Sequence, residues 1–213
     1  SYITAALARA GDPHVSRVLS QFLASHDFAG GSGPEADAPG LAIWALTESA
    51  AYIADPVHDQ WLWPHILRKA QRIEGMLTAR APLVEPYWIP SPHDFNHSRQ
   101  TRTALLAQPA RDGLIVGRVG EDWPLLYVNA VSYRGLLAAA DFAERLGKRQ
   151  QAARWRQHAH GLEESWQRQF PTGSPDSVTY PVSLRALAGS ATRRTQLGQP
   201  MRTYRPPAVS PTA

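Results

Sequence analysis

The hydrophobic positions of this chain recur every three or four residues over five long segments, which is the spacing of amphipathic helices. The first helix is expected over residues 13–25, because Asp12-Pro13 has the form of an N-cap followed by the first helical position. The second is expected over residues 40–54. The apolar positions in these two segments are Val15, Val18, Leu19, Phe22 and Leu23, then Ile43, Leu46, Ala50 and Ile53.

The same spacing predicts three further helices. Asp55-Pro56 restarts the chain, and the third helix ends near residue 79 with Pro64 close to its start, where a missing amide is tolerated. The fourth is expected over residues 124–146 and the fifth over residues 149–170. The apolar stripes of the third, fourth and fifth helices are, in that order, Ile66, Ala70, Ile73 and Leu77; Leu126, Ala130, Tyr133, Leu137 and Ala140; and Trp155, Ala159, Leu162, Trp166 and Phe170.

No segment alternates with a period of two for long enough to predict a sheet, so the expected fold class is all-α, built from helical hairpins. Residues 80–123 contain Pro, His, Asn and Gly without a sustained period, and we expect them to form a long, ordered, functional loop. Beyond residue 170 the periodicity ends. We therefore expect a helical-hairpin domain over residues 1–170 and an irregular or disordered tail over residues 171–213.

The net charge of +4 and the pI near 9.7 raise the question of nucleic-acid binding, which the position of the charge answers. Five of the 22 basic residues follow Asp176 and no acidic residue does, so 17 basic residues face 18 acidic ones before that point. The body is nearly neutral and we expect no nucleic-acid partner. The tail arginines are Arg185, Arg193, Arg194, Arg202 and Arg205.

Composition restricts the chemistry further. The chain has no cysteine, which excludes disulfides, thiolate metal ligands and a cysteine nucleophile. No apolar run approaches the roughly 20 residues of a membrane span, so we expect a soluble chain without a membrane partner. The first ten residues lack the basic and apolar regions of a secretory signal, which favours the cytoplasm over secretion. We expect no cofactor.

Several short motifs, taken in order, resemble the six-hairpin glycosidases, and glucoamylase-like enzymes most of all. The resemblance covers about residues 3–170. The motifs are the stretch from Ala5 to Pro13, the stretch from Asp37 to Leu46, Trp61-Leu62-Trp63-Pro64, Asp112-Gly113-Leu114, Glu121-Asp122, Tyr127-Val128-Asn129-Ala130 with Tyr133, Ala138-Ala139-Ala140 and Leu146-Gly147.

The resemblance implies a barrel of six helical hairpins, an (α/α)6 toroid, of which this chain supplies about half. It also implies inverting hydrolysis of α-linked glucosides, in which a carboxylic acid protonates the glycosidic oxygen and a second carboxylate activates water. By its position, Glu121 matches the general acid of the family. The matching base would come from a later hairpin. Asp37, Tyr87, Trp88, Asp122 and Trp123 are the expected substrate contacts.

Each candidate also has a structural explanation. Glu121 and Asp122 are as well placed to stabilise the positive end of the following helix, and Asp37 to cap the helix after it. Trp44, Trp61 and Trp63 are candidates for sugar stacking, although tryptophans at helical spacing are more often core residues. His93 and His97 have helical metal-ligand spacing, but no third ligand is evident, so we expect no metal site.

Two other functions compete with hydrolysis. A helical scaffold that binds a carbohydrate or a protein without catalysis would fit a chain that lacks the second carboxylate. A phosphorylase of the same fold would use phosphate in place of water and need no separate base. For the favoured reading the partner is an oligosaccharide or polysaccharide. A half-toroid would also expose the faces that normally meet neighbouring hairpins, so we expect self-association.

Overall fold

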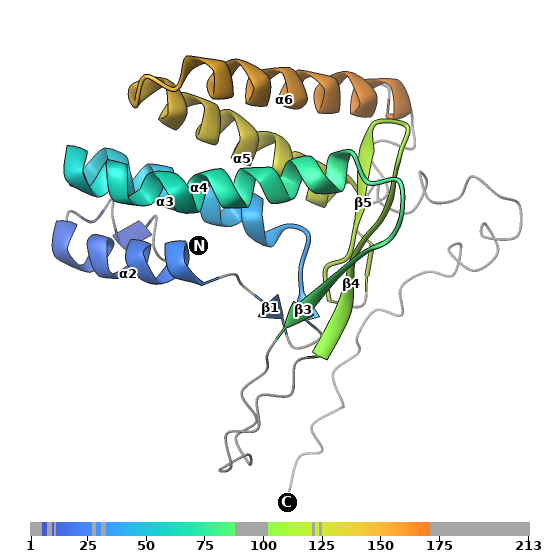
Figure 1. Ribbon diagram of the computed structural model, residues 1–213, viewed down its shortest axis with the longest axis horizontal. Helices are drawn as coiled ribbons and strands as arrows, with labels where there is room; N and C mark the ends of the chain where they lie inside the picture. The colour runs from blue at the N-terminus through green and yellow to red at the C-terminus, as the bar shows by residue number, and fades with distance from the viewer. Residues whose placement is uncertain are drawn as a thin grey trace, which may run out of the picture.

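A computed structural model shows a mostly helical chain with a small sheet at one end of the helices (Figure 1). It describes residues 6–7, 10, 12–26, 29–30, 33–87, 102–120, 122–123 and 125–170. The long helices are α2 (Pro13–Ser25), α3 (Ala38–Ile53), α4 (Pro56–Leu77), α5 (Leu125–Arg145) and α6 (Arg149–Gln169).

The helix predictions are confirmed to within two residues at both ends for α2, α3, α5 and α6. The third helix, α4, differs because it begins directly at Pro56 and contains Pro64 in its interior. Its start is fixed by Asp55, whose carboxylate accepts from the Val57 amide at 2.9 Å. Asp12 caps α2 in the same way, accepting from two amides at 3.0 Å. None of the described helices has the length and apolar character needed to cross a membrane.

The all-α prediction is wrong for residues 83–87 and 102–117, which form a three-stranded antiparallel sheet in the order β3 (Leu83–Tyr87), β4 (Arg102–Arg111), β5 (Leu114–Gly117). The turn between β4 and β5 is Asp112-Gly113, with φ of 53° and 78°. Two positive φ values give a turn whose twist matches paired strands. A second, two-residue pairing joins β1 (Ala29–Gly30) to β2 (Gly33–Pro34).

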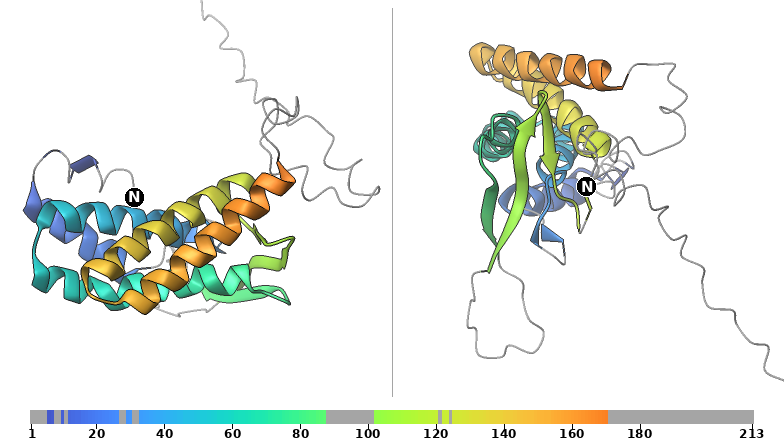
Figure 2. Two further views of the ribbon diagram at one scale, coloured as in Figure 1. Left: turned by 90° about the horizontal axis from the view of Figure 1, so that it is seen from above. Right: turned by 90° about the vertical axis from the view of Figure 1, so that its right-hand side faces the viewer.

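The helices form two antiparallel hairpins, α3 with α4 and α5 with α6, and α2 lies beside the first of them (Figures 1 and 2). The helices α3 and α5 both begin at the sheet end and run side by side, while α4 and α6 run back toward the sheet. The N-termini of α3 and α5 therefore meet beside the sheet. That end of the molecule carries the candidate site.

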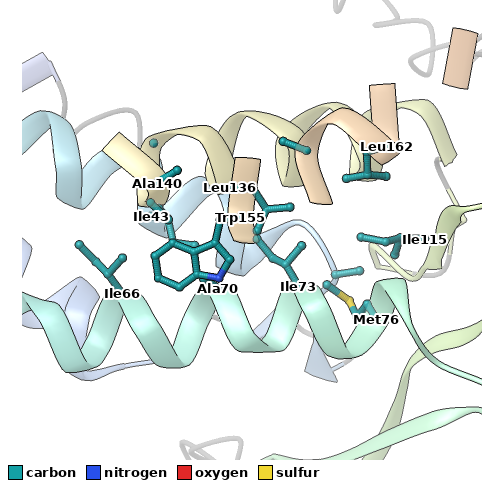
Figure 3. Close-up of a cluster of buried hydrophobic side chains, with 14 of the residues drawn as sticks. Ile43, Ile66, Ala70, Ile73, Met76, Ile115, Leu136, Ala140, Trp155 and Leu162 are labelled. Carbon is teal, nitrogen blue, oxygen red and sulfur yellow. The ribbon is translucent and has the colours of Figure 1, made fainter. Parts of the chain in front are cut away.

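The hydrophobic core lies between α4 and the α5–α6 hairpin (Figure 3). Trp155 of α6 is fully buried there beside Ile66 and Ile73 of α4, and its ring is tilted against Trp63 at a centroid distance of 5.8 Å. The predicted stripes of α3, α4 and α6 are largely confirmed. Their fully buried members include Ile43, Leu46, Ile66, Ala70, Ile73, Trp155 and Ala159.

The stripe predicted for α2 is confirmed only in part, because Leu23 packs against the core and Val15 and Leu19 are half-buried. Val18 and Phe22 are 51% and 59% exposed, and the buried positions are Ser16, Ser20 and Ala24. Small side chains let α2 approach its neighbours closely, and the Ser20 hydroxyl lies 3.1 Å from His58 Nε2 of α4. The inward side of α2 therefore combines small side chains and a hydrogen bond with the apolar contact of Leu23.

Candidate functional site

Asp37 occupies the N-cap position of α3, where the sequence suggested either a cap or a sugar contact. Its side chain makes no capping hydrogen bond. The residue is only 6% exposed, and its Oδ2 accepts from the Tyr127 hydroxyl of α5 at 3.1 Å. Among the described residues, Oδ1 has no hydrogen-bond partner. Buried polar atoms are nearly always paired, so an unpaired carboxylate oxygen calls for an explanation. Asp59 Oδ1 of α4 is a second such oxygen among the described residues.

Burial raises the pKa of Asp37 above its usual range, because a charged carboxylate loses hydration there. The hydrogen bond from Tyr127 and the nearby Asp37 and Ala38 amides favour the charged form and lower the pKa, but they do not cancel the effect of burial. A carboxyl group whose pKa is raised keeps its proton over a wider pH range, and over that range it can donate as well as accept a hydrogen bond.

We expect Asp37→Asn to gain stability relative to the unmodified chain as the pH rises. With a folded-state pKa above the unfolded value of 3.8, the stability linked to protonated Asp37 is complete below that value and is lost as the pH rises through the folded pKa. The uncharged variant has no such loss. Urea unfolding from about pH 4 to about pH 8 measures the difference in the free energy of unfolding, which should grow with pH.

Asp122→Asn is the control, because that carboxylate is exposed on the neighbouring loop and keeps its hydration in the folded chain. The free energy of unfolding of Asp37→Asn is compared with that of the unmodified chain. If this difference changes no more with pH than the difference for Asp122→Asn, Asp37 is not desolvated.

Arg118 joins the segments that carry the candidate residues. It lies just after β5, is 8% exposed, and donates from Nε to the Leu105 carbonyl at 2.7 Å. Its two terminal nitrogens donate to the carbonyls of Gly120 at 2.8 Å and Pro34 at 3.2 Å. One guanidinium therefore holds strand β4, the loop before α5 and the segment that leads into α3. A planar cation with several donors suits this task.

Backbone contacts hold the same two segments together. The Ala36 amide donates to the Arg118 carbonyl at 2.8 Å, and the Gly120 amide donates to the Glu35 carboxylate at 3.1 Å. Val119 and Asp122 exchange two backbone hydrogen bonds of 3.0 Å. The loop on both sides of residue 121 is thus fixed against the N-terminal end of α3.

The other predicted site residues are placed differently. Glu121 and Trp88 lie outside the described residues. Tyr87 ends β3, half-buried, with its ring against Gly33. Asp122 is exposed, while Trp123 is half-buried and packs on the hydrophobic core. The structure therefore brings the loop of Asp122 and Trp123 to the segment of Asp37, and leaves Tyr87 at the outer strand of the sheet.

The three tryptophans on α3 and α4 differ in their surroundings. Trp63 packs against Trp155 in the core. Trp61 is 39% exposed, and its ring stacks with that of His58 and is tilted against that of His65. Trp44 lies in a groove between α3 and α5.

The histidine pair at positions 93 and 97 lies outside the described residues. Within the part of the chain that the structure describes, no three His, Asp or Glu side chains gather as metal ligands would.

Sequence reasoning missed the roles of Tyr127, Arg118 and Glu35. Tyr127 lies in the first turn of α5, 90 positions from Asp37 in the sequence. No local sequence pattern predicts a contact over that separation. Together these residues form an end wall in which one oxygen of a buried carboxyl group has no hydrogen-bond partner among the described residues. Such a wall can bind a hydroxyl group or hold a proton for transfer. No family model, no curated protein and no solved structure matches this chain.

Proposed function

We propose that this chain is a glycoside-hydrolase-like domain of carbohydrate metabolism, which acts on α-linked glucosides with inversion. The observation that carries the proposal is Asp37, a carboxyl group that is 6% exposed, held through Oδ2 by Tyr127, with Oδ1 unpaired among the described residues. Sugars present hydroxyl groups that such an oxygen binds, and hydrogen bonds to charged groups are among the stronger ones.

The arrangement of the helices supports an (α/α)6 toroid as the parent fold. The helices α3 and α5 run side by side from the same end, as inner helices of such a barrel do, and α4 and α6 return on the outside (Figure 2). The site lies where the inner helices begin. In this proposal the chain supplies about half of the barrel.

The proposed reaction uses Glu121 as general acid, a second carboxylate as base and Asp37 as a sugar contact. Glu121 gives its proton to the glycosidic oxygen as the bond between that oxygen and the anomeric carbon breaks. A water molecule attacks the anomeric carbon from the opposite face, and a second carboxylate takes the proton of that water. Asp37 accepts a hydrogen bond from a sugar hydroxyl, with Tyr127 fixing its orientation, and Trp123 lies nearby along the loop. The base comes from further hairpins or from a second copy.

The test is glucose release from short α-linked glucosides by the purified chain, beside Glu121→Gln. We expect release that the variant abolishes and that does not require phosphate. Asp37→Asn should raise KM by about 10- to 100-fold, which is the effect expected from losing a hydrogen bond to a charged group. Glu144→Gln, an exposed change on the distant part of α5, is the control. Equal release from the unmodified chain and Glu121→Gln would contradict the proposal, and release only with phosphate would show a phosphorylase.

A second function, carbohydrate binding without catalysis, is favoured by the state of the two other described carboxylates in the loop and segment beside Asp37. Glu35 is used to hold the Gly120 amide, and Asp122 is exposed. Neither has a buried, unpaired oxygen like that of Asp37. Calorimetric binding of maltose without glucose release, lost in Asp37→Asn, would support this function over hydrolysis.

A further inference from the structure

The helix α2 is attached to α4, which lies beside it, by a seam of polar contacts (Figure 1). Near the start of both helices, Arg17 pairs with Asp55 at 2.7 Å. At the C-terminal end of α2, Arg68 and Lys69 of α4 donate to two of its carbonyl groups, at 3.2 and 3.1 Å. Cations at this end of a helix are favourable. We name the interface the α2–α4 seam, and it consists of Arg17, Ser20, Asp55, His58, Arg68 and Lys69.

The middle of the seam holds a buried histidine. His58 is 3% exposed, and its Nε2 lies 3.1 Å from the Ser20 hydroxyl oxygen. That hydroxyl donates to the Arg17 carbonyl at 2.8 Å, so the hydrogen between Ser20 and His58 belongs to Nε2. The neutral ring therefore already supplies the contact that joins the two helices. A second proton would go to the other ring nitrogen and add a buried positive charge.

The charged groups around His58 come from three helices. Arg17 belongs to α2 and pairs with Asp55, while Asp59 of α4 pairs with Arg145 of α5 at 3.4 Å. Burial lowers the pKa of His58, because a charged ring would lose its hydration there, and the Arg17 cation acts in the same direction. Asp59 and Asp55 act in the opposite direction without cancelling these effects. The docked helix thus disfavours the protonated ring.

Little apolar surface holds α2 in place. Its inward side consists of Ser16, Ser20 and Ala24 with the contact of Leu23, and a helix of 13 residues is marginally stable alone. Such an element opens at a lower free energy than the whole fold. We propose that α2 is a pH-sensitive strap, docked on α4 while His58 is neutral and released when His58 gains a proton. The strap uses no residue of the candidate site and is independent of the proposed function.

The direction of the pH effect follows from proton binding. With α2 released, His58 meets water and returns toward its ordinary pKa of 6.5, whereas with α2 docked its pKa is lower. Between these two values the released state binds more protons. Docking therefore weakens as the pH falls below 6.5 and stops weakening below the docked pKa. One proton changes the docking equilibrium by at most about tenfold per pH unit.

The test is amide hydrogen exchange of the full chain at about pH 7.5 and about pH 5.5, with rates corrected for the intrinsic effect of pH. We expect protection of the α2 amides to fall roughly three- to tenfold, while protection in α6 hardly changes. His58→Gln should remove the fall, because its amide donates to Ser20 and does not titrate. His65→Gln, the same change at a histidine of α4 whose ring is tilted against Trp61, should keep it.

An equal fall in His58→Gln and the unmodified chain would overturn the inference. So would α2 protection that does not change with pH, or a fall that α6 shares, which is acid unfolding of the whole chain. His14 and His26, exposed at the two ends of α2, titrate in the same range. A fall that disappears in His14→Gln or His26→Gln but persists in His58→Gln would assign the effect to the helix ends and reject His58.

A second measurement applies if His58→Gln has already lost α2 protection at about pH 7.5. The imidazole of His58 in the unmodified chain is then titrated by nuclear magnetic resonance. A pKa below 6.5, together with the fall in α2 protection over the same range, supports the strap. A pKa at or above 6.5 overturns it, because docking then does not oppose the proton.

Discussion

Arg118→Met is expected to lower the free energy of unfolding by roughly 3 kcal/mol, because three carbonyl groups lose a charged donor at once. The carbonyls belong to Pro34, Leu105 and Gly120, at donor distances of 2.7 to 3.2 Å. Methionine keeps much of the apolar stem but donates no hydrogen bond. Urea unfolding followed by circular dichroism measures the loss.

Arg156→Met is the matched control. Arg156 is bound to Asp141 and Glu144 on the exposed side of the α5–α6 hairpin. Exposed ion pairs contribute little, so we expect hardly any change in stability. A loss for Arg118→Met no larger than for Arg156→Met would show that the buried guanidinium does not hold the fold together.

The position of Arg118 connects this loss of stability to the candidate site. Pro34 lies three residues before Asp37, and Gly120 lies immediately before Glu121. Hydrogen exchange should therefore show reduced protection of the Ala36 and Gly120 amides in Arg118→Met, since both bind within this junction. Under the proposed function, glucose release should fall in the same variant even where it remains folded.

The helices could be predicted because their boundaries are local. Asp12-Pro13 and Asp55-Pro56 mark helix starts by side-chain capping and by a proline with a fixed φ, and both starts are found at those residues. Gly147, with φ of 72°, ends the fourth predicted helix as a C-terminal glycine does. Such signals lie within a few residues of the structure they determine.

The sheet was missed because its strands carry weak periodic signals. Strand β5, Leu114–Gly117, is buried at every position, so it shows no alternation. Strand β4 is interrupted by Pro109, and β3 by Pro86. The Asp112-Gly113 turn was the best local sign of a hairpin. The runs beside this turn do not alternate in hydrophobicity, and for that reason the sequence favours a loop there.

The candidate site could be predicted only in part, for a related reason. Asp37 was singled out, but its partner on α5 and the guanidinium of Arg118 come from segments about 80 to 90 positions away. Tertiary packing decides those contacts. The same holds for α2, where close packing of Ser16, Ser20 and Ala24 leaves Val18 and Phe22 of the hydrophobic stripe exposed.

Gly135→Ala is expected to cost roughly 2 kcal/mol, because the added methyl group would enter the crossing of the two inner helices. A Cβ at Gly135 would lie 2.7 Å from the Cα and 3.1 Å from the carbonyl oxygen of Gly40. Both atoms belong to a backbone, so no side-chain rotation relieves the contact and the helices must separate. Equilibrium urea unfolding of the variant measures the cost.

Gly161→Ala is the control that separates packing from helix propensity. Gly161 lies in α6 and is exposed, and a Cβ there would meet nothing within 4 Å. Alanine is favoured over glycine in a helix by about 1 kcal/mol, so this variant should gain stability while Gly135→Ala loses it. Equal gains in both variants would show that α3 and α5 separate at little cost. The Asp37–Tyr127 hydrogen bond, which also spans α3 and α5, would then depend on the loop contacts of Arg118 and not on the helix crossing.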